Sequence, residues 1–407
     1  MKLGAIILNS TPNLPDLEAE AVLDSAIAFS PLVFQRGREP NAILLTGATG
    51  LLGAYLLHEL LNKTTADIYC LIRCSDTEAG KYRLQQHLEF YTLWQAASSV
   101  RIIPVVGDLS QPLFGLSKPQ FRELASRIDL IYHNGALTDS AIPYEQLKAI
   151  NVLGTQEILR LASLAPIKPV HFISTVTVFF SHTYAQVDRV RETDIPIVDA
   201  GLNNGYKQSK WVAEQLIRVA QARGLPACIY RPFRIMGHSQ TGIYGKFKNF
   251  FLSFLKACIQ MQKFPAFDVE LNIVPIDYAS QAIVHLSQQA ESFGKAFHLI
   301  NPHSITWKQL IEFIRDLGYA LEEVAEEEWL IAIEQYTTQQ DDNQSEIALP
   351  RLLKAANQIR AKKPQFEGSQ TIQGLVGSFI TCPPVDANLI ANYFSYFQKV
   401  GYLPVPT

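Results

Sequence analysis

The sequence predicts an α/β fold built on a doubly wound parallel sheet, followed by a smaller and mainly helical lobe. Three observations predict this class. Short apolar runs alternate with segments of helical periodicity from residue 42 to about residue 230, as in parallel βαβ units. Three glycines stand directly after the first apolar run, where a strand would turn into a helix. After residue 235 this alternation gives way to longer helical patterns.

The predicted strands are short and apolar, as expected for strands that are buried on both faces of a sheet. They are Ala42–Thr46, Ile68–Ile72, Arg101–Val106, Leu130–His133, Val170–Ser174 and Ala227–Tyr230. Helical patterns follow the first strand up to about residue 63, and then recur near residues 77–94, 119–126, 145–165 and 205–223. Right-handed crossovers between such units give a doubly wound sheet.

The chain divides into three predicted parts. Residues 1–40 are a lead-in or linker with a short helix that starts near Asp16, and residues 41–235 form the dinucleotide-binding Rossmann domain. Residues 236–407 form the substrate lobe, some segments of which return to the Rossmann sheet. In that lobe phenylalanines from Phe247 to Phe254 recur at helical spacing, and they suit either an acyl chain or a packed core.

Composition excludes several function classes. The chain has 407 residues, 48% of them hydrophobic, and a formal net charge of −3. This balance gives no global attraction to nucleic acid or to an anionic membrane, and no segment predicts integral membrane association. The five cysteines form no CxxC pair and the nine histidines show no ligand spacing, so we expect no metal site and a cytoplasmic location.

The glycines predict a cradle for a dinucleotide pyrophosphate. Gly47, Gly50 and Gly53 permit the tight turn and the close approach of backbone N–H groups, and Thr49, Leu51 and Leu52 belong to the same segment. The alternative is a glycine-rich turn that is only structural, and the strand before it and the helix after it argue against that alternative.

Two arginines predict that the cofactor is NADPH rather than NADH. Arg73 follows the second strand, where a carboxylate would bind an adenosine 2′-hydroxyl but an arginine can pair with a 2′-phosphate. Arg83, in the next helix, is a second candidate for that phosphate. For each arginine a solvated surface position is the alternative.

Two further strand ends are candidates for cofactor contacts. Asp108, followed by Leu109, ends the third strand and could accept a hydrogen bond from the adenine amino group. Asn134, Gly135 and Ala136 end the fourth strand, where small residues would let the cofactor lie close. Ligands bind at these carboxyl ends in open α/β sheets.

A proton-transfer group is predicted on the helix near residues 205–223. Tyr206 and Lys210 are four residues apart and therefore share one helix face, where the ammonium is expected to lower the pKa of the phenol. Such a tyrosine can give a proton to a carbonyl oxygen as hydride arrives at the carbon. Thr175, at the end of the fifth strand, could donate a hydrogen bond to the same oxygen.

Together these residues resemble the extended short-chain dehydrogenase/reductase family. The resemblance is closer to the thioester reductase domains that terminate nonribosomal peptide and polyketide synthases, and to the reductase domain of carboxylic acid reductases. Its marks are Leu45–Gly53, Leu71–Arg73, Gly107–Leu109, His133–Ala136, Asn151–Thr155, Ser174–Thr175, Asn204–Trp211, Tyr230–Pro232, Val274–Tyr278, Cys382–Asp386 and Gly401–Pro404.

The resemblance implies a catalytic triad of Thr175, Tyr206 and Lys210, with Thr175 rather than Ser174 in the first place and Pro232 beside the nicotinamide. It implies NADPH-dependent reduction of a carrier-bound acyl or peptidyl thioester to an aldehyde, and further to an alcohol if a second hydride is used. The partner would be a carrier protein that presents a phosphopantetheine thioester. Phe233 and Arg234 depart from the family, many members of which have glycine after the Arg-Pro pair, and a bulkier loop there could narrow the substrate mouth.

Other functions stay open at this point. Within the same fold the chain could be a fatty acyl-CoA reductase or a sugar-nucleotide epimerase or dehydratase. A non-enzyme alternative is a cofactor-sensing scaffold protein, which would have no need of Tyr206 or Lys210. A thioesterase is disfavoured because residues 237–242 do not form a nucleophile elbow. The acyl group, the number of reductions and the oligomeric state do not follow from the sequence.

Overall fold

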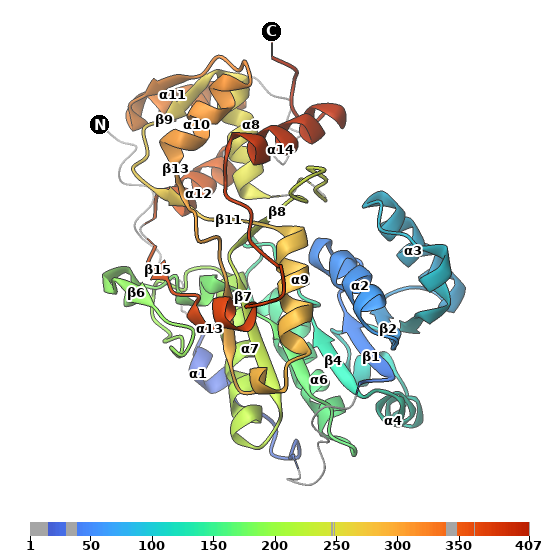
Figure 1. Cartoon of the computed structure of the whole chain (residues 1–407). Coiled ribbons are helices and arrows are strands. Elements are labelled where there is room, and N and C mark those ends of the chain that lie inside the picture. Colours follow the sequence, from blue (N-terminus) through green and yellow to red (C-terminus); the bar gives the residue numbers. More distant parts are fainter. Residues whose placement is uncertain are drawn as a thin grey trace.

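The computed structural model describes residues 15–29, 39–245, 247, 249–338, 348–361 and 363–406. Figure 1 shows a sheet domain flanked by helices, with a second lobe above it in this view. The lead-in that we expected over residues 1–40 is therefore described only in part. In that part the short helix α1 (Leu17–Glu20) begins after Asp16, whose carboxylate accepts a hydrogen bond from the Ala19 backbone N–H at 3.1 Å.

A seven-stranded sheet of parallel strands forms the centre of the sheet domain, in the order β12-β7-β5-β4-β1-β2-β3. The strands are β1 (Ala42–Thr46), β2 (Asp67–Ile72), β3 (Ile102–Val106), β4 (Leu130–His133), β5 (Val170–Ile173), β7 (Ala227–Pro232) and β12 (Ala296–Leu299). The predicted fold class is confirmed, and all six predicted strands are present. The sequence pattern did not indicate β12, which has four residues and pairs with β7 at the edge of the sheet.

Helices cover both faces of this sheet. They are α2 (Leu51–Lys63), α3 (Thr77–Phe90), α4 (Lys118–Arg127), α5 (Tyr144–Lys148), α6 (Gly154–Ser163), α7 (Gly205–Ala222) and α9 (Ile276–Ser287). Alternate residues of one strand point to opposite faces, so Leu44 of β1 joins the core with α4, α6 and α7, while Ile43 and Leu45 join the core with α2, α3 and α9. A π turn at Ala149–Leu153 joins α5 to α6 within one continuous helical segment.

The second lobe has its own core of aromatic and aliphatic side chains. Its helices are α8 (Phe250–Met261), α10 (Trp307–Asp316), α11 (Glu326–Thr338), α12 (Leu349–Arg360) and α14 (Ala387–Lys399). Phe254 lies at the centre, with its ring centroid 5.8 Å from that of Trp307 and 5.1 Å from that of Trp329. The phenylalanine stripe of α8 is thus mostly core: Phe251 and Phe254 are buried, and Phe250 and Phe251 also line the cleft described below.

The remaining elements are short, and several of them belong to the second lobe. The remaining strands are β6 (Arg189–Val190), β8 (Arg234–Met236), β9 (Lys263–Pro265), β10 (Glu270–Leu271), β11 (Ile273–Pro275), β13 (Ile305–Thr306), β14 (Glu322–Val324) and β15 (Gln365–Phe366), and the helix α13 spans Ser369–Gly374. Short 3-10 segments of three to six residues lie at Ala96–Arg101, Pro112–Gly115, Val176–Phe179, Tyr184–Gln186 and Ala290–Ser292. The segment after residue 236 also returns to the sheet domain, since α9 packs on the α2 side and β12 completes the sheet.

Candidate active site

A cleft of about 1540 Å³ opens at the carboxyl ends of the parallel strands, and residues of both the sheet domain and the second lobe line it. It is lined by every residue that the sequence analysis assigned to a site except Gly53. Those lining residues are Gly47, Thr49, Gly50, Leu51, Leu52, Arg73, Arg83, Asp108, Leu109, Asn134, Gly135, Ala136, Thr175, Tyr206, Lys210 and Pro232. Residues that are far apart in the sequence therefore meet at one edge of the sheet, as open α/β sheets require of a ligand site.

The glycine turn between β1 and α2 is packed too tightly for side chains. Gly47 has a φ of +73°, and a Cβ atom there would lie 2.8 Å from the Cα atom of Gly135. A Cβ atom on Gly53 would lie 1.9 Å from the carbonyl oxygen of Gly47. Gly53 therefore lets the helix start directly under the turn, which explains why it belongs to the motif without lining the cleft.

The start of α2 has the properties of an anion site. The helix begins after Gly50, and no side chain caps its first N–H groups. Those donors and the positive end of the helix dipole face the cleft at a turn of small residues. The residues present therefore fit the pyrophosphate of a dinucleotide.

The two arginines predicted for the 2′-phosphate lie side by side at one end of the cleft. The Arg83 guanidinium donates a hydrogen bond to the backbone carbonyl of Arg73 at 2.7 Å. Both side chains are exposed, so either can move toward an anion. The geometry therefore brings the pair together at the end of β2.

The strand ends beside the glycine turn are fixed by local hydrogen bonds. The Asp108 carboxylate accepts a bond from the Ser110 N–H at 2.8 Å, and the Asn134 side chain donates to the Gly47 carbonyl at 3.3 Å. Gly135 packs so closely that a Cβ atom there would lie 2.5 Å from the Leu109 side chain. Gly135 and Ala136 both line the cleft beside these side chains.

Tyr206 and Lys210 are positioned by the first turns of α7. The helix begins at Gly205 because the Asn204 side chain accepts a hydrogen bond from the Lys207 N–H at 3.0 Å. The Lys210 amine donates to the Ile173 carbonyl at 2.6 Å and lies 4.2 Å from the centre of the Phe172 ring. The spacing of four residues thus brings the phenol and the amine to the end of β5.

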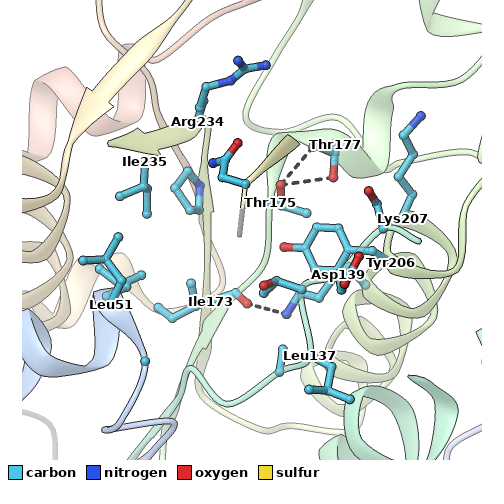
Figure 2. A pocket seen from close by; sticks show the side chains of 18 of the residues that line it. Leu51, Leu137, Asp139, Ile173, Thr175, Thr177, Tyr206, Lys207, Arg234 and Ile235 are labelled. Carbon is cyan, nitrogen blue, oxygen red and sulfur yellow. Dashed lines mark hydrogen bonds between the residues drawn. The ribbon is translucent and has the colours of Figure 1, made fainter. Parts of the chain in front are cut away.

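Thr175 lies directly after β5 and faces the same part of the cleft. Its hydroxyl accepts a hydrogen bond from the Thr177 N–H at 3.2 Å and lies 3.2 Å from the Thr177 hydroxyl. Figure 2 shows the Tyr206 ring beside these two threonines, with Asp139 nearby. The neighbouring Ser174 has a different role, since its hydroxyl donates to the buried Glu214 carboxylate at 2.6 Å.

The expectation that Lys210 makes the Tyr206 phenol more acidic is wrong for the protein in this structure. Burial raises the pKa of Tyr206 to about 12, although a hydrogen bond with Thr175 works in the other direction. Burial also lowers the pKa of Lys210 to about 7, against the opposing effect of Glu214. The sequence pattern places both groups on one helix face, but it does not indicate how strongly the folded protein desolvates them.

Several cationic side chains that line the cleft were not assigned to the site from the sequence. Lys207, Lys354 and Lys363 line it together with Arg234, which the sequence analysis noted only as a departure from the family pattern. Lys207 lies next to Tyr206, but nothing in the sequence indicates that Lys354 and Lys363 reach the same cavity. The adjacent Phe233 lies between Phe180 and Phe366, at centroid distances of 5.9 Å from each.

Membrane spans and metal-binding clusters are both absent from the part of the chain that the structure describes. No helix among them is both long enough and apolar enough to cross a bilayer. No group of three or more histidine, cysteine, aspartate or glutamate side chains among them is arranged to hold a metal ion.

Comparison with known proteins gives consistent matches. The NAD-binding family described as male sterility protein matches residues 45–283. The chain is 40% identical over 406 residues to one subunit of the linear gramicidin synthase of Brevibacillus parabrevis, and 32% identical over 408 residues to an isonitrile lipopeptide synthase of Streptomyces coeruleorubidus. These matches cover 100% and 96% of the chain but only 8% and 27% of the relatives, so the chain spans a small part of their length.

Solved structures also match over most of the chain. The terminal R domain of the myxalamid PKS-NRPS biosynthetic pathway has a TM-score of 0.89 and 41% identity, with 96% of this chain and 99% of that one covered. A thiolation-reductase di-domain of an archaeal non-ribosomal peptide synthetase has a TM-score of 0.74 and 25% identity, covering 90% of this chain and 77% of that one.

Proposed function

The chain belongs to the male sterility protein family, within the extended short-chain dehydrogenase/reductases, and on this basis we propose that it uses NADPH to release a carrier-bound acyl or peptidyl thioester as an aldehyde. The observation that carries the proposal is the meeting of two groups in one cleft. The glycine cradle lies at one end of β1, and Thr175 and Tyr206 lie at the end of β5 in the same cavity.

The dinucleotide would be held by residues along the strand ends. Gly47 to Gly53 and the start of α2 suit the pyrophosphate, while Arg73 and Arg83 suit a 2′-phosphate. Asp108 and Leu109 would border the adenine, and Asn134, Gly135 and Ala136 would border the adjoining parts of the cofactor. Tyr206, Lys210 and Pro232 would surround the nicotinamide riboside. When bound, NADPH supplies a hydride to the carbonyl carbon of the thioester.

The residues of the chain then act on the carbonyl oxygen. Thr175 and Tyr206 would donate hydrogen bonds to it, and Tyr206 would give it a proton as negative charge develops. A pKa of about 12 keeps the phenol protonated at neutral pH, which suits a donor. The resulting hemithioacetal collapses when its C–S bond breaks, and the products are an aldehyde and a thiol. Lys210 would hold the nicotinamide ribose and return a proton toward Tyr206.

The thiol product would be the phosphopantetheine arm of a carrier protein. The relatives are named as synthases, and the archaeal structure joins a thiolation domain to a reductase domain. A carrier on another chain, or on another part of a longer chain, would place its arm in the open side of the cleft.

The test uses the purified chain with NADPH and a panel of acyl thioesters, read as absorbance loss at about 340 nm with the products identified by mass spectrometry. We expect one NADPH per aldehyde, or two per alcohol. Tyr206→Phe should lose most of the turnover, by about 10²–10⁴-fold, while NADPH binding is kept.

Two results would contradict the proposal. An epimerase or dehydratase would convert a sugar nucleotide without net loss of NADPH. A cofactor-sensing scaffold would bind NADPH and turn over none of the thioesters, and the substitution of Tyr206 would then change nothing.

A further inference from the structure

A group of three cations faces the cleft beyond the threonine and tyrosine hydroxyls, and no carboxylate of the described residues pairs with it. The group consists of Arg234, Lys207 and Lys363, all of which line the cavity. In the view of Figure 2 the side chains of Arg234 and Lys207 lie on two sides of Thr175 and Thr177, and both extend upward from that level.

Arg234 is the member of the group with the most unused hydrogen-bonding capacity. Its guanidinium lies 4.1 Å from the centre of the Phe251 ring, which presents an apolar face to it. Its buried Nη1 atom has no hydrogen-bond partner among the described residues, nor does the guanidinium form an ion pair with them. An arginine carries five donors in a planar fork, so this is an unusual amount of donor capacity to leave unused.

The three cations act on one another. Burial lowers the pKa of Lys363 to about 7, and the charges of Arg234 and Lys207 act in the same direction. Burial lowers the pKa of Lys207 to about 8, with a further contribution from Lys354. Within the described part of the chain both lysine amines donate hydrogen bonds to neutral oxygens. The Lys363 amine donates to the Ile359 carbonyl at 2.9 Å, and the Lys207 amine donates to the Asn203 side chain at 3.2 Å.

The carboxylate of Asp139 also lines the cleft, but it acts on Lys354, which is outside the group of three cations. Burial lowers the pKa of Lys354 and the charge of Asp139 opposes that shift, while the Lys354 amine donates to the Ser140 carbonyl at 2.7 Å. No carboxylate contributes to the pKa of Lys207, Lys363 or Arg234 among the described residues. Like charges in a partly buried site destabilise the fold, so the arrangement costs stability unless an anion is bound there.

We propose that Arg234, Lys207 and Lys363 form a subsite for an anionic oxygen group, a carboxylate or a phosphate, on the thioester whose carbonyl is reduced. The inference rests on the proposed function and adds a substrate class to it. The anion would be carried either by the acyl group or by the pantetheine arm. Arginine favours such a planar or tetrahedral oxyanion because its fork can donate two parallel hydrogen bonds.

Four synthetic thioesters separate the two sources of the anion. They combine a neutral valeryl or an acidic glutaryl group with pantetheine or with phosphopantetheine. If the acyl group carries the anion, glutaryl thioesters should have a KM about 10- to 100-fold below that of valeryl thioesters on either arm. If the arm carries it, phosphopantetheine should give the same advantage with either acyl group.

Variants test whether the three cations cause the preference. Arg234→Met and Lys363→Met should each bring the KM of the anionic thioesters to within a few-fold of the KM that the same variant has for valeryl-pantetheine. Arg360→Gln is the control, since Arg360 pairs with Glu326 on the surface and does not line the cleft. A preference that persists in both methionine variants, or equal KM values for all four thioesters, would overturn the subsite.

A binding measurement keeps this inference separate from the proposed function. With NADP⁺ saturating, glutarate or methyl phosphate should raise the melting temperature of the wild type but not that of Arg234→Met. Without an added anion, Arg234→Met should have a higher melting temperature than the wild type, because the substitution removes one of the like charges. No stabilisation by either anion would count against the subsite. Stabilisation without turnover of any thioester would contradict the proposed function alone.

Discussion

At the scale of single residues, burial decides the protonation states at the centre of the cleft. Tyr206 and Lys210 are shifted toward their neutral forms, to pKa values of about 12 and about 7. A neutral phenol is a competent proton donor, but at a pKa of about 12 it is a weaker acid than the phenol of lowered pKa that the helix spacing predicted. Burial is the largest cause of each shift, and it outweighs the hydrogen bond of Thr175 with Tyr206 and the charge of Glu214 near Lys210.

Lys210 gives the stability of the protein a specific pH dependence. The folded state binds fewer protons than the unfolded state between pH 7 and pH 10.5, because the pKa of Lys210 is lowered, so its contribution to stability rises with pH across that window. Relative to Lys210→Met, the wild type should gain up to about 1 kcal/mol per pH unit there. Urea denaturation at about pH 6.5, 8 and 9.5 measures this difference. Lys308→Met removes an exposed amine as the control, and parallel wild-type and Lys210→Met curves would contradict the expectation.

Arg73 should set the preference between the two nicotinamide cofactors. Arg73→Ala removes a charge-assisted contact that only a 2′-phosphate can make, so Kd for NADPH should rise by about 10- to 100-fold while Kd for NADH stays nearly constant. Fluorescence titration with both cofactors measures this. Arg122→Ala is a matched loss of an exposed arginine outside the cleft. If both cofactors weaken equally, Arg73 does not touch the phosphate.

At the scale of elements, the turn from β1 to α2 is specified by backbone packing. The three glycines of the motif are not equivalent. A Cβ atom on Gly53 would overlap the Gly47 carbonyl, whereas a Cβ atom on Gly50 would meet only that oxygen, at 3.3 Å. Gly50 also has a φ of −94°, which any residue adopts.

We expect the two alanine substitutions in this turn to differ. Gly53→Ala should force the helix away from the turn, lower the free energy of unfolding by about 1–3 kcal/mol or more, and abolish most NADPH binding. Gly50→Ala should cost about 1 kcal/mol or less as a weaker helix cap and bind NADPH with modest loss. Thermal melting and cofactor titration of both variants measure this. An equal loss of binding in the two variants would show that bulk near the phosphate, and not helix packing, is the limiting factor.

Elements also differ in how well their sequence reports them. The buried strands β1 to β5 and β7 of the sheet appear as apolar runs because both of their faces are covered. The edge strand β12 has four residues, like the predicted strands β4 and β5, but it lies beyond residue 235, where the alternation of short apolar runs and helices gives way to longer helical patterns. Its place in the sheet is set by its pairing with β7, a contact between segments far apart in the sequence. The predicted helix at 145–165 is present, but its π turn at Ala149–Leu153 was not predicted. There Asn151 bonds both Leu137 backbone groups and Ser209, contacts across three segments that local propensity does not contain.

At the scale of the whole molecule, the cleft lies between the sheet domain and the second lobe, each of which has its own packed interior. The sheet domain supplies the cradle and the hydroxyl groups, and the second lobe supplies Lys354, Asn357 and Lys363 on the opposite wall. The second core contains the buried faces of α8, α10, α12 and α14. Substitutions in this core can therefore displace the cleft residues of the second lobe, although the core residues themselves do not contact the reacting atoms.

Two phenylalanines of the C-terminal region should separate core packing from surface exposure. Phe397 is 1% exposed and Phe379 is 99% exposed. Phe397→Ala should lower the free energy of unfolding by about 3–5 kcal/mol, because it leaves a cavity in the second core. Phe379→Ala should change it by less than about 0.5 kcal/mol. Denaturant titrations with and without NADPH measure both. A comparable loss for both variants would mean that Phe379 is covered in solution.

The sequence by itself determined the fold class, the tight glycine turn before the first long helix and the family, and all of these have local causes. Glycine sterics, strand and helix periodicity and short motifs are encoded in residues that are neighbours in the chain. The tertiary structure decided which charges are desolvated, that Arg234 and Lys363 share a cavity with Tyr206, and that a seventh strand closes the sheet. These features depend on residues far apart in sequence, because burial and electrostatic coupling follow distance in space and not separation along the chain.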